Sequence, residues 1–124
     1  MIHHLGKENS LVNQFISELR DAEIQQDSFR FRKNLERLGE IFAYEISKKI
    51  NYVSQQVITQ LGELEIQVID KWPVLATILR AGLPFHQGFL NFFDKSESAF
   101  ISAYRKHHKD GRFTIQVEYV SCSS

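Results

Sequence analysis

The sequence predicts an α/β fold in which N-terminal helices precede a parallel sheet and a protruding β-hairpin. Residues 73–104 carry the main signal, because two apolar runs, "PVLATIL" (73–79) and "SAFISAY" (98–104), flank a stretch of helical character, "LPFHQGFLNFF" (83–93). A strand–helix–strand unit of this kind places its two strands parallel. Helical periodicity before residue 50 and an Asp110-Gly111 turn signal complete the pattern.

The first predicted helix lies within "NSLVNQFISELRDAE" (9–23). Leu11, Phe15 and Leu19 recur every four residues, which is the spacing of one helix face. Asn9 or Ser10 can act as the N-cap, because either side chain can accept a hydrogen bond from the first turn.

The second predicted helix, "DSFRFRKNLERLGEIFAYEISKKI" (27–50), has Asp27 or Ser28 as its cap and Lys48 and Lys49 in its last turn. Gly39 costs such a helix about 1 kcal/mol relative to alanine, which favours a close contact there. The expected core stripe is Phe31, Leu35, Leu38, Phe42 and Ile46. A basic face predicts either a solvated surface or a contact with an effector nucleotide or partner subunit: Arg30, Arg32, Lys33 and Arg37.

Two β-hairpins are expected. In the first, "YVSQQVIT" (52–59) and "LEIQVID" (64–70) flank a short turn, and the second run alternates apolar with polar residues. In the second, at about residues 104–120, Asp110-Gly111 separates two strands. An exposed alternating hairpin needs a partner for its apolar side, so a dimer is expected there.

Composition narrows the classes of function. The 124 residues predict one domain, and 15 basic against 15 acidic residues give a formal net charge of zero, which argues against nucleic-acid binding through a basic surface. No apolar run is long enough to span a bilayer, and residues 1–10 lack the regions of a signal peptide. One cysteine excludes an internal disulfide framework. The expected location is the cytoplasm.

The candidate site follows the first parallel strand, in "ILRAGLPFHQG" (78–88). Arg80 and Gly82 stand where a strand meets a helix N-terminus, and Arg105 follows the second strand. Two arginines and free N–H groups at one sheet edge suit a phosphate or diphosphate. The alternative is a solvated strand end with an ordinary turn. His86, one turn into the helix, either touches a ligand or packs in the core.

"TILRAGL" (77–83) and the downstream "AYR" (103–105) resemble uracil phosphoribosyltransferase, a type I phosphoribosyltransferase. The order of elements also resembles that family, including a long helix that ends near Tyr44-Glu45. The resemblance implies a Rossmann-like parallel sheet and transfer of a 5-phosphoribosyl group from phosphoribosyl diphosphate to uracil with Mg²⁺. It assigns diphosphate binding to Arg80, Ala81, Gly82 and Arg105, and implies a non-proline cis peptide near Arg80–Ala81.

Other parts of the family pattern have no match within these residues. The phosphoribosyl-diphosphate loop with its "MLATG"-like residues is missing, and so is the "GYIIPGLGDxGD"-like segment that binds uracil. We therefore expect the first half of a subunit, inactive alone, with a helical part (1–50), a hairpin (51–70), a strand–helix–strand core (73–104) and a β-arm (104–120) through which a homodimer forms. The alternative is a non-catalytic dimerisation or regulatory module that keeps an anion site. No metal ligand and no catalytic residue is identified in this chain.

Overall fold

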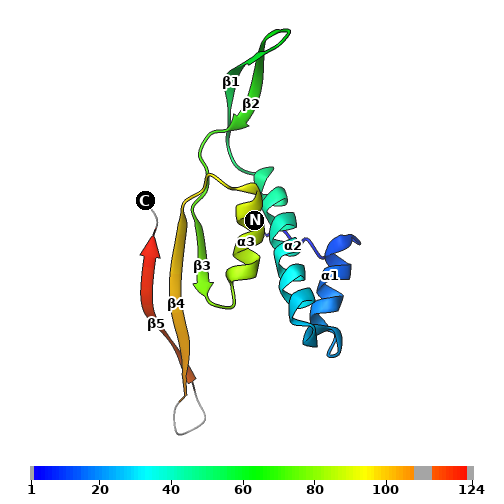
Figure 1. Cartoon of the computed structure of the whole chain (residues 1–124), viewed down its shortest axis with the longest axis vertical. Coiled ribbons are helices and arrows are strands. Elements are labelled where there is room, and N and C mark those ends of the chain that lie inside the picture. The colour runs from blue at the N-terminus through cyan, green and yellow to red at the C-terminus, as the bar shows by residue number, and fades with distance from the viewer. Residues whose placement is uncertain (1, 108–112, 123–124) are drawn as a thin grey trace.

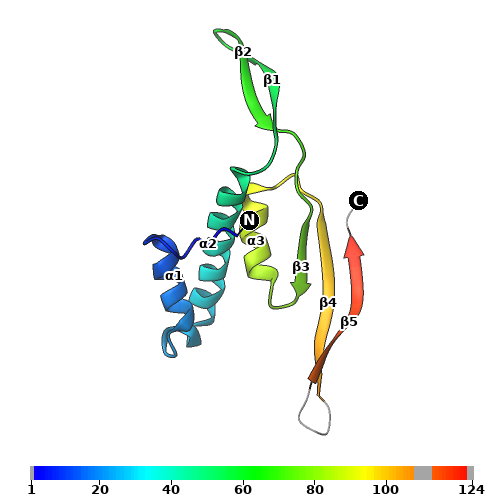
Figure 2. The ribbon, with the colours of Figure 1, turned by 180° about the vertical axis from the view of Figure 1, so that it is seen from behind.

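The computed structural model describes the backbone of residues 2–107 and 113–122 and the side chains of residues 2–102. Three helices lie on one side of a three-stranded sheet, and a separate two-stranded hairpin projects away from both (Figures 1 and 2). Within the described residues, no helix is long and apolar enough to cross a lipid bilayer. The elements are α1 (Leu11–Arg20), the 3₁₀ turn η1 (Ile24–Gln26), α2 (Ser28–Ser47), β1 (Tyr52–Thr59), β2 (Gly62–Ile69), β3 (Leu75–Leu79), α3 (Leu83–Phe92), β4 (Ser98–His107) and β5 (Phe113–Cys122).

The helix starts agree with the sequence. The Ser10 side chain accepts a hydrogen bond from the Val12 amide, and the Asp27 side chain accepts one from the Arg30 amide, so each caps its helix. The end of α2 differs, because the helix stops at Ser47 and the expected last-turn lysines lie beyond it. Lys48 is the C-cap and pairs with Glu45 at 3.2 Å.

The buried side of α2 is narrower than the predicted stripe. Leu38 is buried, but Phe31 and Ile46 are exposed by 36% and 43%. Asn34 is wholly buried, and no periodicity argument singles it out. Because α2 packs against α1 and against α3, its buried positions lie between these two contacts: Asn34, Leu38, Gly39 and Ala43.

The sheet has the order β3-β4-β5 and is mixed. β3 and β4 are parallel, with Leu75 opposite Ser98 and Leu79 opposite Ser102, as the strand–helix–strand signal predicts. β5 is antiparallel to β4, because the two strands form the second hairpin. The parallel β3–β4 pair and the hairpin of β4 with β5 confirm the parallel unit and the protruding hairpin that the sequence predicts. Residues 103–107 of β4 extend past the end of β3 and pair with β5 alone, and the Asp110-Gly111 turn lies outside the described residues.

β3 is covered on one face only. Leu75, Thr77 and Leu79 are half-buried, whereas Ala76 and Ile78 on the other face are exposed. The apolar run predicted a strand covered on both faces, but the helices lie on one side of the sheet (Figure 2). Along its edge β3 pairs with β4 alone among the described strands.

α2 and α3 cross at two glycines. A Cβ built on Gly39 would lie 2.3 Å from the Phe85 carbonyl oxygen, and one built on Gly88 would lie 2.1 Å from the Glu36 carbonyl oxygen. No real Cβ approaches backbone this closely, so neither position accepts a side chain unless the helices move apart. This confirms the close contact that Gly39 predicted.

We predict that Gly88→Ala destabilises the protein by roughly 1–3 kcal/mol, because the added methyl group forces two backbones apart. Intrinsic helix propensity has the opposite sign and would stabilise α3 by about 1 kcal/mol. Urea unfolding measures the difference. Gly6→Ala is the control, since a Cβ there would make only an ordinary contact of 3.5 Å. A stabilised Gly88→Ala variant would contradict the tight crossing.

Candidate functional site

The candidate site is the three-residue loop that joins β3 to α3. A non-proline cis peptide joins Leu79 to Arg80, one bond before the position expected from the sequence. Gly82 is the N-cap of α3, and Pro84 stands in its first turn, where the missing proline N–H leaves no helical hydrogen bond unmade. The loop therefore runs directly from the carboxyl end of a strand into the N-terminus of a helix, as the sequence predicted.

Gly82 is needed for space rather than for an unusual torsion. Its φ of −77° is open to any residue. A Cβ at this position, however, would lie 2.3 Å from the Thr77 hydroxyl oxygen and 2.8 Å from the Ile78 carbonyl oxygen. The loop thus folds back on the strand that it follows, and a residue with a Cβ does not fit at position 82 between the loop and the strand.

The loop offers fewer backbone donors than a free helix N-terminus would. The Gly82 N–H donates to the Ile78 carbonyl at 3.1 Å, and the Leu83 N–H donates to the Arg80 carbonyl at 3.1 Å. Pro84 has no N–H. Arg80, Ala81 and Phe85 keep N–H groups with no backbone acceptor in the part of the chain that the structure describes. The expected array of free donors is therefore reduced by the two N–H groups that are already bonded.

Arg80 is the exposed cation of the loop. It forms no ion pair within the described residues, so no carboxylate among them neutralises its guanidinium. Arg105 lies on β4 opposite Ile115, three residues beyond the residue that pairs with Leu79. Both arginines therefore belong to the same end of the sheet, and Arg105 lies about 10 Å beyond the level of Leu79 along the strand direction by residue count. The side chain of Arg105 lies outside the described set.

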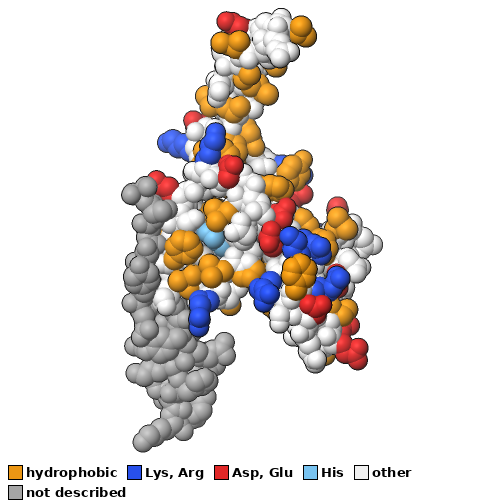
Figure 3. All heavy atoms as spheres, in the orientation of Figure 1, with side chains coloured by type: hydrophobic (Ala, Val, Ile, Leu, Met, Phe, Trp, Pro, Cys, Tyr) orange, Lys and Arg blue, Asp and Glu red, His pale blue; other side chains and the backbone are white. Residues whose placement is uncertain are grey.

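The basic face of α2 is divided between two roles. Arg30 pairs with Glu18 of α1 at 2.8 Å, and Arg37 lies 5.4 Å from the centre of the Phe15 ring. Arg32 and Lys33 instead line a hollow of about 360 Å³ together with the first residues of α3. In Figure 3, Lys and Arg side chains form patches over the lower ends of β3, α3 and α2.

Arg32 thus brings positive charge next to the N-terminus of α3, whereas Lys33 lies 3.8 Å from the carboxylate of Glu36, which lines the same hollow. The sequence showed these cations but gave no sign of this neighbourhood, because about fifty residues separate them from Leu83 and Pro84. Only the crossing of the two helices brings them together.

His86 packs in the core and does not face the loop. It is 6% exposed, its Nε2 lies 3.1 Å from the Ser98 hydroxyl oxygen, and its ring contacts Phe100 edge-on at 5.4 Å. Ser98 is the first residue of β4, whereas Arg80 follows the last residue of β3. His86 therefore lies near the end of the sheet where β3 and β4 begin, away from Arg80. Burial lowers the pKa of His86 below its ordinary value. Of the two predicted roles, packing is the one observed.

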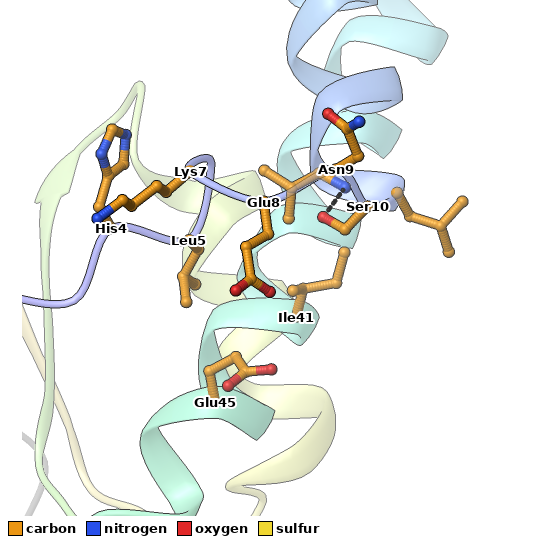
Figure 4. A pocket seen from close by; sticks show the side chains of 10 residues that line it. His4, Leu5, Lys7, Glu8, Asn9, Ser10, Ile41 and Glu45 are labelled. Atoms are coloured by element: carbon orange, nitrogen blue, oxygen red, sulfur yellow. Dashed lines mark hydrogen bonds between the residues drawn. The ribbon is translucent and has the colours of Figure 1, made fainter.

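A second hollow, of about 590 Å³, lies between the N-terminal segment and α2 (Figure 4). Glu8 and Glu45 direct carboxylates toward it, and His4 and Lys7 stand at its border. None of the residues predicted to bind diphosphate lines this hollow. Across the described residues, no group of three or more His, Cys, Asp or Glu side chains could hold a metal ion.

Comparison with known proteins adds three findings. The sequence model of the family "Uracil phosphoribosyltransferase" matches residues 7–119. A uracil phosphoribosyltransferase of Porphyromonas gingivalis is 57% identical over 118 residues, which cover 95% of this chain and 55% of that protein. One of Pyrococcus furiosus is 34% identical over 116 residues, which cover 92% and 48%.

A solved structure of a protein from Aquifex aeolicus superimposes on this chain with a TM-score of 0.79 and 25% sequence identity. The match covers 97% of this chain and 55% of that one. The chain spans about half the length of the curated relatives that it matches.

We predict that acid weakens folding through His86. Its pKa is lowered in the folded state, so below about pH 6.5 the unfolded chain binds a proton that the folded chain resists, and the free energy of unfolding falls as the pH falls. Urea midpoints measured from about pH 7.5 down to pH 5 should decline in the native protein and decline less in His86→Gln. His3→Gln, an exposed control, should keep the native slope. Equal slopes in all three proteins would contradict this.

Proposed function

The chain belongs to the uracil phosphoribosyltransferase family, and we propose that the protein transfers a 5-phosphoribosyl group from phosphoribosyl diphosphate to uracil, giving UMP and diphosphate. The family match over residues 7–119 is the observation that carries this proposal. The matched region includes the loop after β3, so the residues with the most suitable chemistry lie inside it. The reaction is a step of pyrimidine salvage.

In this proposal Arg80, Ala81, Gly82 and Arg105 bind the diphosphate part of phosphoribosyl diphosphate. An arginine fork gives paired, charge-assisted hydrogen bonds to phosphate oxygens, and Arg80 has no competing carboxylate among the described residues. The free N–H of Ala81 supplies a further donor. Gly82 lets the loop lie flat against β3, because a Cβ at this position would clash with the strand.

The chemistry follows from where charge develops. The bond between the ribose carbon and the diphosphate oxygen breaks, the ribose carbon gains positive character, and a bond to a uracil nitrogen forms with loss of a proton. Negative charge accumulates on the departing diphosphate. Fixed positive charge beside that group stabilises it more in the transition state than in the bound substrate, which lowers the barrier.

Mg²⁺ is the implied cofactor of this reaction. The described residues contain no cluster of carboxylates or imidazoles that could hold it. Mg²⁺ commonly binds substrate phosphates and water with only one or two carboxylates, so in this proposal it accompanies the phosphoribosyl diphosphate. We assign no step of the reaction to it.

We further propose a cytoplasmic homodimer. The chain would form one domain that corresponds to the N-terminal half of a phosphoribosyltransferase subunit, and the 104–120 hairpin would be an arm that holds the second subunit. Residues 103–107 of β4 support this, because they leave β3 behind and keep only β5 as a neighbour. A ribbon of two strands is stable when something covers its apolar side.

We predict that Arg80→Ala weakens binding of inorganic diphosphate roughly 10- to 100-fold, which is the size expected for one charge-assisted contact. Isothermal titration calorimetry on the full native polypeptide with Mg²⁺ measures this. Arg80→Lys should recover part of the affinity, because lysine keeps the charge and loses the fork. Arg20→Ala, at the end of α1, is the matched control and should bind like the native protein. An unchanged affinity in Arg80→Ala would overturn the site assignment.

The activity is tested separately. The full native polypeptide with labelled uracil, phosphoribosyl diphosphate and Mg²⁺ should yield labelled UMP, resolved by chromatography. Diphosphate binding without UMP formation would favour the non-catalytic dimerisation or regulatory module instead.

A further inference from the structure

Gly82 is the residue that ties the loop after β3 to both of its neighbours. Its N–H donates to the Ile78 carbonyl of β3 at 3.1 Å, which closes the loop onto the strand. Its own carbonyl accepts a hydrogen bond from the His86 N–H at 2.9 Å, which is a first-turn bond of α3. Any movement of Gly82 away from the strand would therefore disturb a bond to β3 and a bond to α3 together.

Arg80 and Ala81 lie between two fixed points of the backbone. On one side Leu79, the last residue of β3, is paired with Ser102 of β4. On the other side Gly82 is held by its two hydrogen bonds. Only two residues bridge these points where the strand turns into α3 (Figure 1), so the place of Gly82 relative to β3 fixes where Arg80 stands.

The Thr77 hydroxyl is the side-chain group that lies against Gly82. A Cβ built on Gly82 would overlap the Thr77 hydroxyl oxygen, and the Cα–H bond that takes the place of this Cβ is directed toward that oxygen. Contacts between a Cα–H group and an oxygen atom are weakly attractive and closer than contacts between two carbon atoms. The strand side of the loop therefore rests on one oxygen atom.

Burial alone does not explain a threonine at position 77. Thr77 shares the inward face of β3 with Leu75 and Leu79 and is half-buried like them. It lines a hollow of about 330 Å³ in which His86 is the other polar side chain. In such apolar surroundings a hydroxyl group is less favourable than a methyl group of the same shape. Valine would serve the packing better, so the oxygen has another use at this position.

We propose that Thr77 is a positioning residue whose hydroxyl oxygen supports Gly82 and thereby sets the positions of Arg80 and Ala81. This role rests on the proposed function, in which Arg80 and Ala81 bind diphosphate. A methyl group is larger than an oxygen atom, so valine at position 77 would push Gly82 away from β3. The Arg80 guanidinium would then move relative to the phosphate oxygens, and its paired hydrogen bonds depend closely on geometry.

The test compares two substitutions that remove opposite halves of the same side chain. Thr77→Val keeps the shape and loses the oxygen, whereas Thr77→Ser keeps the oxygen and loses the methyl group. Isothermal titration calorimetry of the full native polypeptide with inorganic diphosphate and Mg²⁺ should show an affinity at least about fivefold weaker in Thr77→Val and within about twofold of native in Thr77→Ser. A residue that serves packing alone would give the opposite order, because the apolar hollow loses more in Thr77→Ser.

A second measurement needs no ligand. In amide NMR spectra of the protein without diphosphate, the N–H signals of Ala81 and Gly82 should shift in Thr77→Val, because the loop is displaced. The same two signals should stay close to their native positions in Thr77→Ser. Urea unfolding checks that both variants fold.

The outcomes separate this role from the proposed function. A folded Thr77→Val variant that binds diphosphate as tightly as the native protein would overturn the positioning role. If the native protein binds no diphosphate, the proposed function fails, and the amide signals decide alone: unchanged Ala81 and Gly82 signals in Thr77→Val refute the support of Gly82. If Thr77→Val does not fold, Thr77→Ala replaces it, since it removes the oxygen without adding bulk, and native affinity in Thr77→Ala would count equally against the hydroxyl.

Discussion

The close crossing of α2 and α3 at Gly39 and Gly88 is the constraint on which the positions of the other parts depend. With no side chain between them, the two helix backbones touch, and the contact extends through an edge-on Phe42–Phe85 pair at 5.5 Å. At the far end of α3, the Asn91 amide donates to Glu36 at 2.8 Å. Because a loop of only three residues joins α3 to β3, a shift of α3 on α2 would carry Arg80 with it.

The same crossing decides the electrostatics of the candidate site. It brings Arg32 and the Lys33–Glu36 ion pair of α2 beside the first turn of α3, so the positive end of the helix and the Arg32 guanidinium share one region of the surface. The loop itself supplies less than its sequence suggests, since two of its N–H groups are already used inside the loop. Side-chain cations, more than backbone donors, therefore make this region attractive to an anion.

Local signals predicted most of the architecture. Caps, periodicity and turn residues were enough for both N-terminal helices, both hairpins and the strand–helix–strand unit, because each depends on residues close in sequence. What the sequence could not give depends on contacts between distant segments. The burial of Asn34, the burial of His86 against Ser98 and the split of the α2 basic face all result from packing between elements. For the site, the loop residues were predictable from their order, but their partners across the fold were not.

β3 is built like a strand from the middle of a sheet. Strands that end a sheet usually carry a lysine, an internal proline or a bulge that discourages further pairing. "LATIL" (75–79) has none of these, and Ile78 is 58% exposed. In the described part of the chain its outer row of N–H and C=O groups meets no other strand. An unpaired strand edge of this kind forms backbone hydrogen bonds with an extended segment, either from the same polypeptide or from a neighbouring molecule. We therefore expect an unpaired β3 flank to promote aggregation of this chain in isolation.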